Sequence, residues 1–274
     1  MLIYPDIDPV AIDVGFLQIR WYGISYVAGI LLAWWLLRVR STKLYEIWSP
    51  DQVADLIFYA TVGIILGGRL GSVLFYNLPY YLEHPLGVFK IWEGGMSFHG
   101  GLIGVLIAIW WFGHRQKIGF FNVSDFLTPV VPVGLLLGRI ANFINGELWG
   151  RPTDLPWGMV FPDPRAGGLP RHPSQLYEAL LEGVVLFAVL WWFSSRPRPV
   201  MAVSGLFLLL YGIFRGLAEL VREPDRQVGF LAGDWLTMGM LLSAPMIVFG
   251  ILLLYPAWRR RQVSGSAAVE PRID

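Results

Sequence analysis

Four polar residues follow directly on one of the most apolar stretches of this chain. The apolar run FLTPVVPVGLLL leads into GRIANFINGELWG (138–150), which carries Arg139, Asn142, Asn145 and Glu147. In a helix, positions 139, 142 and 145 share one face. A guanidinium binds phosphate oxygens in pairs, and amides add further hydrogen bonds. The spacing therefore predicts one wall of a pocket for a phosphate group. Glu147 follows Gly146, at which we expect the helix to end.

A second polar stripe lies in YGIFRGLAELVREPD (211–225). Tyr211, Arg215 and Glu219 are four residues apart, so they also share a helical face. Arg215 and Glu219 can pair within their own helix, which gives both a purely structural interpretation. Arg139 has no carboxylate one turn away, so it needs a carboxylate from another helix or an anionic ligand.

Two carboxylates in another apolar segment are candidates for that partner. The motif RHPSQLYE (171–178) ends in Glu178, and Glu182 follows four residues later. We expect these two to pair with arginines of other helices, among them Arg69 or Arg139. Arg69 lies within a glycine series, and we favour a structural role for it over a place in the pocket. His172, before Pro173, is expected near the start of the helix.

His99 stands among glycines in GGMSFHGG (94–101). The glycines let the backbone approach another helix or a ligand closely. A single histidine is commonly a hydrogen-bonded structural residue. Near an arginine-rich pocket, a role as general base or substrate positioner is an equally good interpretation.

The composition is that of a polytopic membrane protein. Of 274 residues, 55% are hydrophobic and only 15% are charged, and the mean hydropathy is +0.55. An apolar run of about 17–25 residues can cross a bilayer as a helix. We predict an all-α fold of about seven transmembrane helices, at 21–38, 53–77, 96–113, 121–144, 176–195, 200–220 and 235–257. Glycines four apart in the second, third and fourth of these, ending at Gly138, predict tight helix packing.

The distribution of basic residues predicts the topology. Links after the first, third and fifth spans, together with the tail, carry Arg38, Arg40, Lys43, Arg115, Lys117, Arg196, Arg198, Arg259, Arg260, Arg261 and Arg272. The other side carries fewer: Arg20, Lys90, Arg151, Arg165, Arg171, Arg222 and Arg226. The positive-inside rule then places the N-terminus outside and the C-terminus in the cytoplasm. We expect one integral-membrane catalytic domain at 1–258 with an extracytoplasmic cap at 145–175, and a polar cytoplasmic tail at 259–274, disordered at its end.

Several kinds of chemistry are excluded or disfavoured by the residue inventory. The chain has no cysteine, so disulfides, thiolate metal ligands and a cysteine nucleophile are excluded. Its four histidines have no metal-binding spacing, and we expect no metal site. The acidic N-terminus lacks the basic start of a signal peptide, so we treat it as part of the mature protein. We expect no nucleic-acid partner.

Taken together, the motifs resemble one family, the prolipoprotein diacylglyceryl transferases of the bacterial inner membrane. The resemblance rests on seven stretches in the family's order, from the first span to the sixth: RWYG (20–23), GGRLG (67–71), GGMSFHGG (94–101), SDF (124–126), GRIANFINGELWGR (138–151), RHPSQLYE (171–178) and YGIFRGLAELVREPD (211–225). The fifth stretch contains the family signature without departure.

The resemblance implies a reaction and its partners. The diacylglyceryl group of phosphatidylglycerol would pass to the lipobox cysteine of a prolipoprotein, giving a thioether and glycerol-1-phosphate, as the first step of lipoprotein maturation. The reacting thiol belongs to the substrate, which agrees with a chain free of cysteine. The resemblance implies no cofactor, and it implies a multi-pass protein of the bacterial inner membrane.

The resemblance also implies roles for individual residues. Arg139 matches the arginine that binds the phosphate, and Arg215 matches a second essential arginine. His99 matches the histidine proposed to activate the thiol. The remaining matches are expected to bind the headgroup or to support that binding: Tyr22, Asn142, Asn145, Glu147, Tyr211 and Glu219.

Two other classes of function fit arginines within the membrane. An anion transporter or channel would also line its path with arginines, but it predicts broken helices or an inverted repeat, and we see no internal repeat. A lipid-binding scaffold would use the arginine stripe as a headgroup clamp without chemistry. An intramembrane protease is disfavoured, because the spans contain neither a GxSx motif nor paired aspartates.

Overall fold

Long apolar helices account for most of the chain, as its hydrophobic runs predict. The computed structural model describes residues 2–5, 7–15, 18–43, 48–224, 229–233 and 235–266. Within this part, six helices are long and apolar enough to cross a membrane: Trp21–Thr42, Pro50–Phe75, Phe120–Ile144, Ser174–Phe193, Ala202–Glu219 and Met238–Pro256. Each coincides with a predicted span to within a few residues.

The seventh predicted span, 96–113, differs from the other six. It is an α-helix, α4 (Phe98–Gln116), but it is not among the helices of the described chain that are apolar enough to span by composition. His99 near its start and His114 and Arg115 in its last turn lower the mean hydropathy of this short helix. The hydropathy of this helix therefore does not test the predicted number of seven transmembrane helices.

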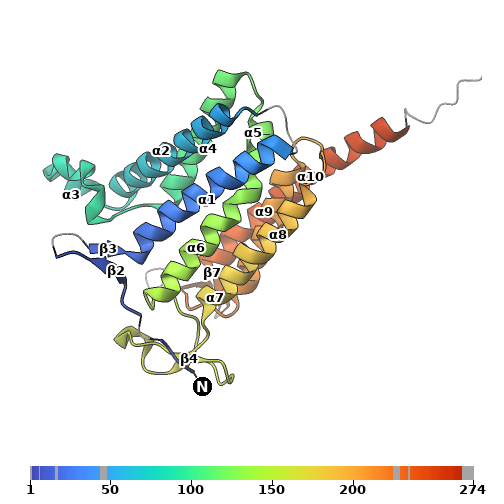
Figure 1. Cartoon of the computed structure of the whole chain (residues 1–274). Helices are drawn as coiled ribbons and strands as arrows, with labels where there is room; N and C mark the ends of the chain where they lie inside the picture. Colours follow the sequence, from blue (N-terminus) through green and yellow to red (C-terminus); the bar gives the residue numbers. More distant parts are fainter. Residues whose placement is uncertain are drawn as a thin grey trace, which may run out of the picture. The chain divides into compact units, whose positions relative to one another are not determined.

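The chain divides into two units, and Figure 1 labels the helices that they contain. Unit 1 consists of Met1–Ala33 and Leu127–Asp274, and unit 2 of Trp34–Phe126. Helix α1 (Trp21–Lys43) begins in unit 1 and ends in unit 2.

In unit 2, α4 packs antiparallel to α2 (Pro50–Phe75). The contact is made by the glycines spaced four residues apart, for which the sequence predicts tight packing. A Cβ added to Gly63 would lie 2.6 Å from the carbonyl oxygen of Gly104, and one on Gly67 would lie 2.3 Å from that of Gly100. Such contact between backbones is possible only without side chains, which is the use of small residues in membrane helix pairs. Gly134 and Gly138 were also expected to pack tightly, but a Cβ on either would meet no atom within 4 Å. Gly134 does contact another helix, since its Cα would lie 3.7 Å from a Cβ added to Gly29 of α1.

The connection between α2 and α4 is held by Arg69, which is 4% exposed. The connection contains α3 (Leu78–Glu83), η1 (Pro85–Phe89) and η2 (Ile91–Glu93). The Arg69 guanidinium donates to the carbonyl oxygens of Gly87 at 2.6 Å, Val88 at 2.9 Å and Gly94 at 2.5 Å. The structural interpretation of Arg69 is therefore confirmed, because its donors are used by the backbone of this connection.

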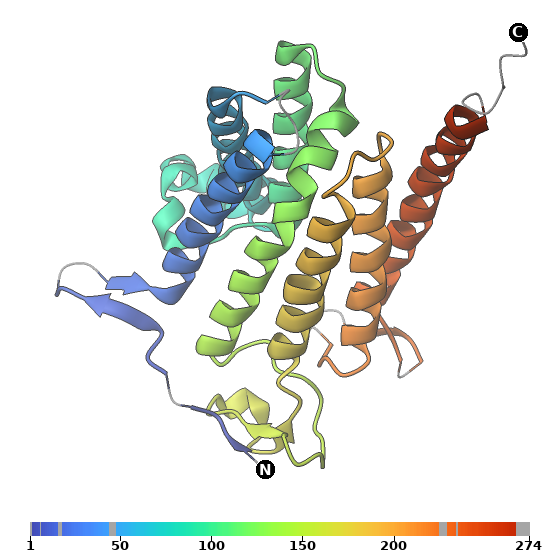
Figure 2. The same cartoon turned by 45° about the vertical axis from the view of Figure 1, so that its right-hand side comes forward.

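Unit 1 is a helical bundle. Its helices are α6 (Val131–Ile144), α7 (Ser174–Glu178), the π-helix η5 (Ala179–Val185), α8 (Leu186–Phe193), α9 (Ala202–Glu219) and α10 (Met238–Ser266). A short turn, η3 (Thr128–Val130), joins α5 (Phe120–Leu127) to α6. Helices α6, α8 and α9 run side by side, and α10 lies against α9 (Figure 2). Leu186, Leu190 and Val203 form the apolar centre between α8 and α9.

Helix α10 continues past the predicted end of the membrane domain, as far as Ser266. The end of the predicted tail, residues 267–274, lies outside the described residues, so its expected disorder is untested.

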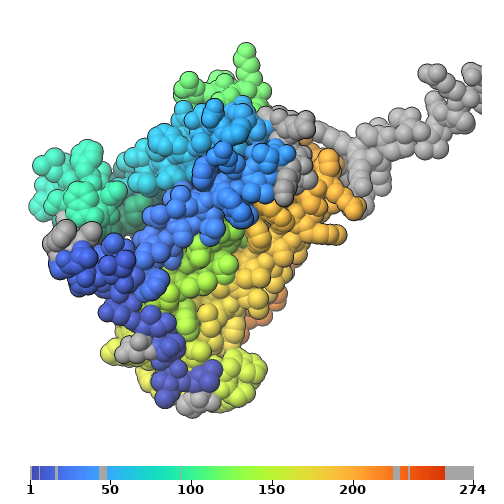
Figure 3. Space-filling model, viewed as in Figure 1, coloured from blue at the N-terminus to red at the C-terminus, as the bar shows by residue number. Residues whose placement is uncertain are grey.

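The segment 145–175 folds against the N-terminus of the chain. It contains β4 (Met159–Val160), η4 (Pro164–Ala166) and β5 (Pro170–Arg171), and β1 (Leu2–Ile3) pairs with β4. Tyr4, Trp149, Phe161 and Ala166 form its buried apolar cluster. In Figure 3 the first residues, in dark blue, lie against this yellow-green segment.

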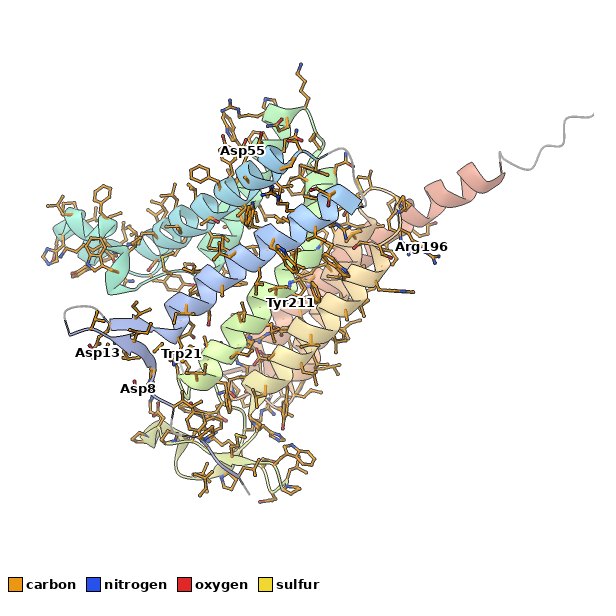
Figure 4. The ribbon with its side chains drawn as sticks, viewed as in Figure 1. Asp8, Asp13, Trp21, Asp55, Arg196 and Tyr211 are labelled. Carbon is orange, nitrogen blue, oxygen red and sulfur yellow. The ribbon has the colours of Figure 1, made fainter. Side chains whose placement is uncertain are left out.

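Two further pairs of short strands lie outside segment 145–175. The all-α prediction included none of the short strands of the described chain. β2 (Val10–Asp13) and β3 (Gln18–Arg20) form a hairpin before α1, and β6 (Phe230–Ala232) pairs with β7 (Leu236–Thr237) before α10. Where the hairpin meets α1, the Trp21 side chain donates to the carbonyl oxygen of Asp8 at 3.1 Å (Figure 4).

Candidate functional site

Helix α6 ends in a turn formed by a glycine, and this turn determines where Glu147 lies. Gly146 has φ +62°, its N–H donates to the carbonyl oxygen of Phe143 at 2.9 Å, and the N–H of Glu147 donates to that of Asn142 at 3.1 Å. This pair of bonds is the Schellman motif, which needs a left-handed residue where glycine stands. The turn brings Glu147 back over the last turn of its own helix.

Tyr22, Asn142 and Glu147 consequently form one hydrogen-bonded group. The Tyr22 hydroxyl at the start of α1 donates to Oε1 of Glu147 and accepts from Nδ2 of Asn142. The same amide nitrogen donates to Oε1 of Glu147 at 2.9 Å. The buried Gln175 fixes the group from α7, because its Nε2 donates to the carbonyl oxygen of Glu147 at 2.5 Å.

One carboxylate oxygen joins the two predicted arginines. Oε2 of Glu178 lies 2.7 Å from Nη2 of Arg139 and 2.7 Å from Nη1 of Arg215. The Glu178 side chain is 0% exposed, so its charge has to be compensated by partners within the bundle. The partner that Arg139 was expected to require is therefore Glu178, and helices α6, α7 and α9 meet at this point.

Two more charged residues extend the cluster along α9 and beyond its end. Glu219 pairs with Arg215 one turn away, as predicted, and also accepts from the Thr237 hydroxyl at 2.6 Å. Arg222 lies 3.8 Å from Glu178 and 4.0 Å from Glu219. The expected pairing of Arg215 with Glu219 is thus one contact in a larger group.

Glu182 completes the cluster from the π-helix η5. Its Oε2 lies 3.5 Å from Arg139 and its Oε1 lies 3.9 Å from Arg215. Gly183 permits this approach, because a Cβ on it would lie only 3.0 Å from Cα of Leu136 in α6. A π-helix changes the direction of the side chains that follow it, and such turns are frequent at functional sites.

The arginines and the glutamates differ in their exposure. The side chains of Arg139, Arg215 and Arg222 are 17%, 14% and 10% exposed. Those of Glu178, Glu182 and Glu219 are 0%, 0% and 4% exposed. The carboxylates therefore lie deeper than the guanidinium groups and hold them in place. The partly exposed members of the cluster are therefore its arginines.

Tyr211 lies halfway along α9 among the side chains of the bundle (Figure 4). Its ring stacks on Phe207 with the centroids 5.6 Å apart, and its hydroxyl is within electrostatic range of Glu182, Arg139 and Arg215. The helical stripe that the sequence predicts therefore faces the cluster.

Most of the predicted site residues come together in unit 1. These are Tyr22, Arg139, Asn142, Glu147, Tyr211, Arg215 and Glu219. Asn145 instead occupies the C-cap of α6, and its side chain makes no hydrogen bond within the described chain. Asn145 keeps a helical backbone there, with its N–H bonded to the carbonyl oxygen of Ala141, and its role in the site stays a prediction. His99 is an exposed residue of unit 2, so its role stays a prediction.

Sequence reasoning assigned no site role to Glu178, Glu182, Gln175 or Arg222. The spacing of the two glutamates in an apolar span was the available signal, and it correctly indicated pairing with arginines of other helices. Gln175 and Arg222 gave no signal of their own, because one amide and one arginine near a helix end are common at such places.

His172 directly precedes the N-cap of α7, in agreement with its expected place near the start of the helix. The N-cap is Pro173, without a side-chain hydrogen bond, and Nδ1 of His172 lies 3.3 Å from the hydroxyl of Tyr177. Partial burial lowers the pKa of His172, so its imidazole is neutral at pH 7. His172 therefore adds no positive charge beside the cluster.

The described part of the chain offers no ligand set for a metal centre. Among the residues that the structure describes, no three histidine, aspartate or glutamate side chains are placed to hold a metal ion.

These features define a class of protein: a polytopic membrane protein with a buried arginine–carboxylate site within its helices. The chain belongs to the prolipoprotein diacylglyceryl transferase family, whose model matches residues 9–256. A relative from Methylococcus capsulatus is 60% identical over 262 residues, covering 95% of this chain and 99% of the relative. Relatives from Solidesulfovibrio magneticus and Pseudomonas aeruginosa are 58% and 55% identical over 93% and 98% of this chain, and over 96% and 100% of their own. All three are named phosphatidylglycerol–prolipoprotein diacylglyceryl transferase.

We predict that Glu178→Gln destabilises the protein markedly, by about 3–5 kcal/mol if both ion pairs are lost. The variant removes the negative charge that two arginines share at 2.7 Å. Glu182→Gln is the matched comparison and should cost less, because this carboxylate accepts no hydrogen bond in the described chain. The measurement is the melting temperature in detergent. An equal or smaller loss for Glu178→Gln would contradict the central place of Glu178.

Proposed function

We propose that this chain transfers the diacylglyceryl group of phosphatidylglycerol to the lipobox cysteine thiol of a prolipoprotein. The products are a thioether-linked lipid on the cysteine and glycerol-1-phosphate. Membership of the family and the names of relatives that match the chain almost end to end support this reaction. The observation that carries it within the molecule is the pair Arg139 and Arg215, held by a single oxygen of Glu178.

The arginine pair suits the charge that develops in this reaction. The thiolate sulfur attacks the carbon of the diacylglyceryl group that is bonded to the phosphate oxygen. A carbon–sulfur bond therefore forms as this carbon–oxygen bond breaks. The electron pair of the broken bond passes to the phosphate oxygen, and the thiol proton passes to a base. Guanidinium groups fixed beforehand stabilise the added charge on the leaving phosphate without reorganising.

The remaining site residues have roles around this phosphate. Tyr22, Asn142 and Glu147, which are joined by hydrogen bonds, bind the glycerol headgroup. Tyr211 and Glu219 support Arg215 from its own helix. Asn145 adds an amide at the end of α6. The prolipoprotein brings the only cysteine that the reaction needs.

His99 is the proposed base. An imidazole nitrogen can accept the proton of a thiol, so a histidine is chemically suited to the step. His99 is exposed, and its ring contacts that of Phe98 beside it, so the imidazole nitrogens are accessible to a substrate.

The chain is proposed to lie in the bacterial inner membrane with its N-terminus outside and its C-terminal tail, 259–274, in the cytoplasm. Residues 1–258 form the catalytic domain, with 145–175 as an extracytoplasmic cap. The seventh span is α4, because it packs antiparallel against the spanning helix α2 over several turns. An odd number of spans agrees with the sorting of basic residues to the cytoplasmic side.

One assay distinguishes the proposed transferase from the two other classes of function. An anion transporter or a lipid-binding scaffold would bind phosphatidylglycerol or its headgroup without changing a peptide. Purified protein, phosphatidylglycerol and a lipobox peptide should give a peptide heavier by one diacylglyceryl group, attached at the cysteine. Mass spectrometry of the peptide decides, and an unchanged peptide would overturn the proposed reaction.

We expect Arg139→Ala to lower the rate of transfer at least about 100-fold, the usual cost of losing one donor to a developing negative charge. The transfer rate of Arg139→Lys should lie between those of the wild type and Arg139→Ala. Lysine keeps the positive charge but lacks the planar guanidinium group that binds two phosphate oxygens at once. The exposed Arg115 of α4 supplies the control, Arg115→Ala, which should stay near the wild-type rate. Normal transfer by Arg139→Ala would refute the phosphate assignment.

His99→Ala is expected to lose about 100-fold or more in turnover while still binding phosphatidylglycerol, since a general base acts in the chemical step. His114→Ala, at the other end of the same helix, is the control; its ring stacks on Trp110. Turnover and lipid affinity are to be measured separately. Near-normal turnover of His99→Ala would exclude it as the base.

The topology predicts that a fluorescent reporter fused after residue 274 is active, since it remains in the cytoplasm. An alkaline phosphatase inserted between Gly167 and Gly168 in segment 145–175 should also be active, because this enzyme needs the oxidising outer side. The reverse pattern of activities would show that the orientation is wrong.

A further inference from the structure

Glu182 differs from the other two glutamates of the cluster. It is 0% exposed, and neither of its carboxylate oxygens accepts a hydrogen bond within the described part of the chain. The charged and titratable groups that face it are Arg139 from α6, Glu178 from α7, and Tyr211 and Arg215 from α9. A buried carboxylate without hydrogen bonds is costly, and a role in function can explain its presence.

The neighbouring glutamates are held as anions by direct hydrogen bonds. Oε2 of Glu178 accepts from Arg215 at 2.7 Å and is the same distance from Arg139. Glu219 accepts from Arg215 and from the Thr237 hydroxyl. Hydrogen bonds to a carboxylate favour its charged form. Of the three, Glu182 therefore loses its charge with the least disruption.

Among the ion-paired residues of the cluster, positive and negative charges are equal in number when every carboxylate is ionised. Three arginines, Arg139, Arg215 and Arg222, face the three glutamates Glu178, Glu182 and Glu219. A phosphodiester adds one negative charge to this group. Since unbalanced charge is strongly unfavourable where water is scarce, binding the anion favours the loss of one carboxylate charge.

We propose that Glu182 takes up one proton when the phosphate of phosphatidylglycerol binds to Arg139 and Arg215. The proton comes from the solvent, converts the carboxylate to a carboxylic acid, and leaves again when the phosphate product leaves. Glu182 is thus a positioning residue: as a neutral acid it no longer competes with the phosphate for the two guanidinium groups. This inference rests on the proposed function, because it uses the phosphate of that substrate.

The test is isothermal titration calorimetry of the purified protein with dihexanoyl phosphatidylglycerol. Titrations in buffers of different ionisation enthalpy give the number of protons taken up on binding. A phosphodiester keeps one negative charge throughout the neutral range, so the lipid itself contributes no proton. The wild type should take up about one proton per lipid, and its affinity should fall up to about tenfold per unit of rising pH.

Three variants identify the residue that takes up the proton. Glu182→Gln, which has the shape of the neutral acid, should bind without taking up a proton, with an affinity independent of pH. Glu182→Asp keeps a titratable carboxylate and should retain proton uptake. Glu83→Gln, at an exposed position of α3, should behave as the wild type does.

The outcomes separate this inference from the function on which it rests. If the wild type binds the lipid without proton uptake, or if Glu182→Gln retains the uptake, the inference is wrong and the phosphate site stands. Absence of proton uptake by the wild type overturns the inference even if Glu182→Gln fails to fold. If dihexanoyl phosphatidylglycerol binds no better than dihexanoyl phosphatidylcholine, the proposed substrate is wrong, and the inference falls with it.

Discussion

One oxygen atom, Oε2 of Glu178, holds the polar centre of unit 1 together. It binds the guanidinium groups of Arg139 and Arg215, which come from two different helices, at the same distance of 2.7 Å. A fully buried carboxylate has to find positive partners, and a buried arginine has to find negative ones. The need to satisfy these groups at one point fixes the rotation of α6, α7 and α9 about their axes. Apolar packing alone restricts that rotation much less, because lipid and side chains are equally apolar.

The same need explains how a site for an anion can exist before the anion arrives. Arginines without partners would repel one another and adopt many conformations. Here each is held by carboxylates that lie deeper in the bundle, while its own side chain keeps 10–17% of its surface exposed. The guanidinium groups are therefore ordered in advance, and the proposed phosphate meets them without a large loss of side-chain entropy. Such preorganisation is the property that a stabiliser of developing charge requires.

The sequence predicted the helices well because length and apolar composition determine which segments cross a bilayer. It also predicted which side chains share a face, since that follows from the helical period, and Tyr211, Arg215 and Glu219 lie as expected. It could not assign Glu178 to Arg139, because a contact between helices depends on their relative rotation. The π-helix that carries Glu182 was equally unpredictable: the sequence ALLEGVV has no feature that distinguishes it from an ordinary apolar helix. The pairing of β1 with β4 joins residues more than 150 positions apart, and short strands of two residues leave no periodic pattern.

The hydrogen bonds between Arg69 and the connection from α2 to α4 affect which residues of this connection can be substituted. The guanidinium of Arg69 donates its hydrogen bonds to backbone carbonyl oxygens of the connection and also lies over the ring of Tyr81 in α3. Every residue type offers the same carbonyl group. The path of the connection is therefore held in part by a residue that lies outside it, in α2, and in part by Gly94 and Gly95, whose φ angles are +86° and +72°. Its exposed side chains, such as Leu86, Phe89 and Trp92, are free to be exchanged in evolution without altering the course of the backbone.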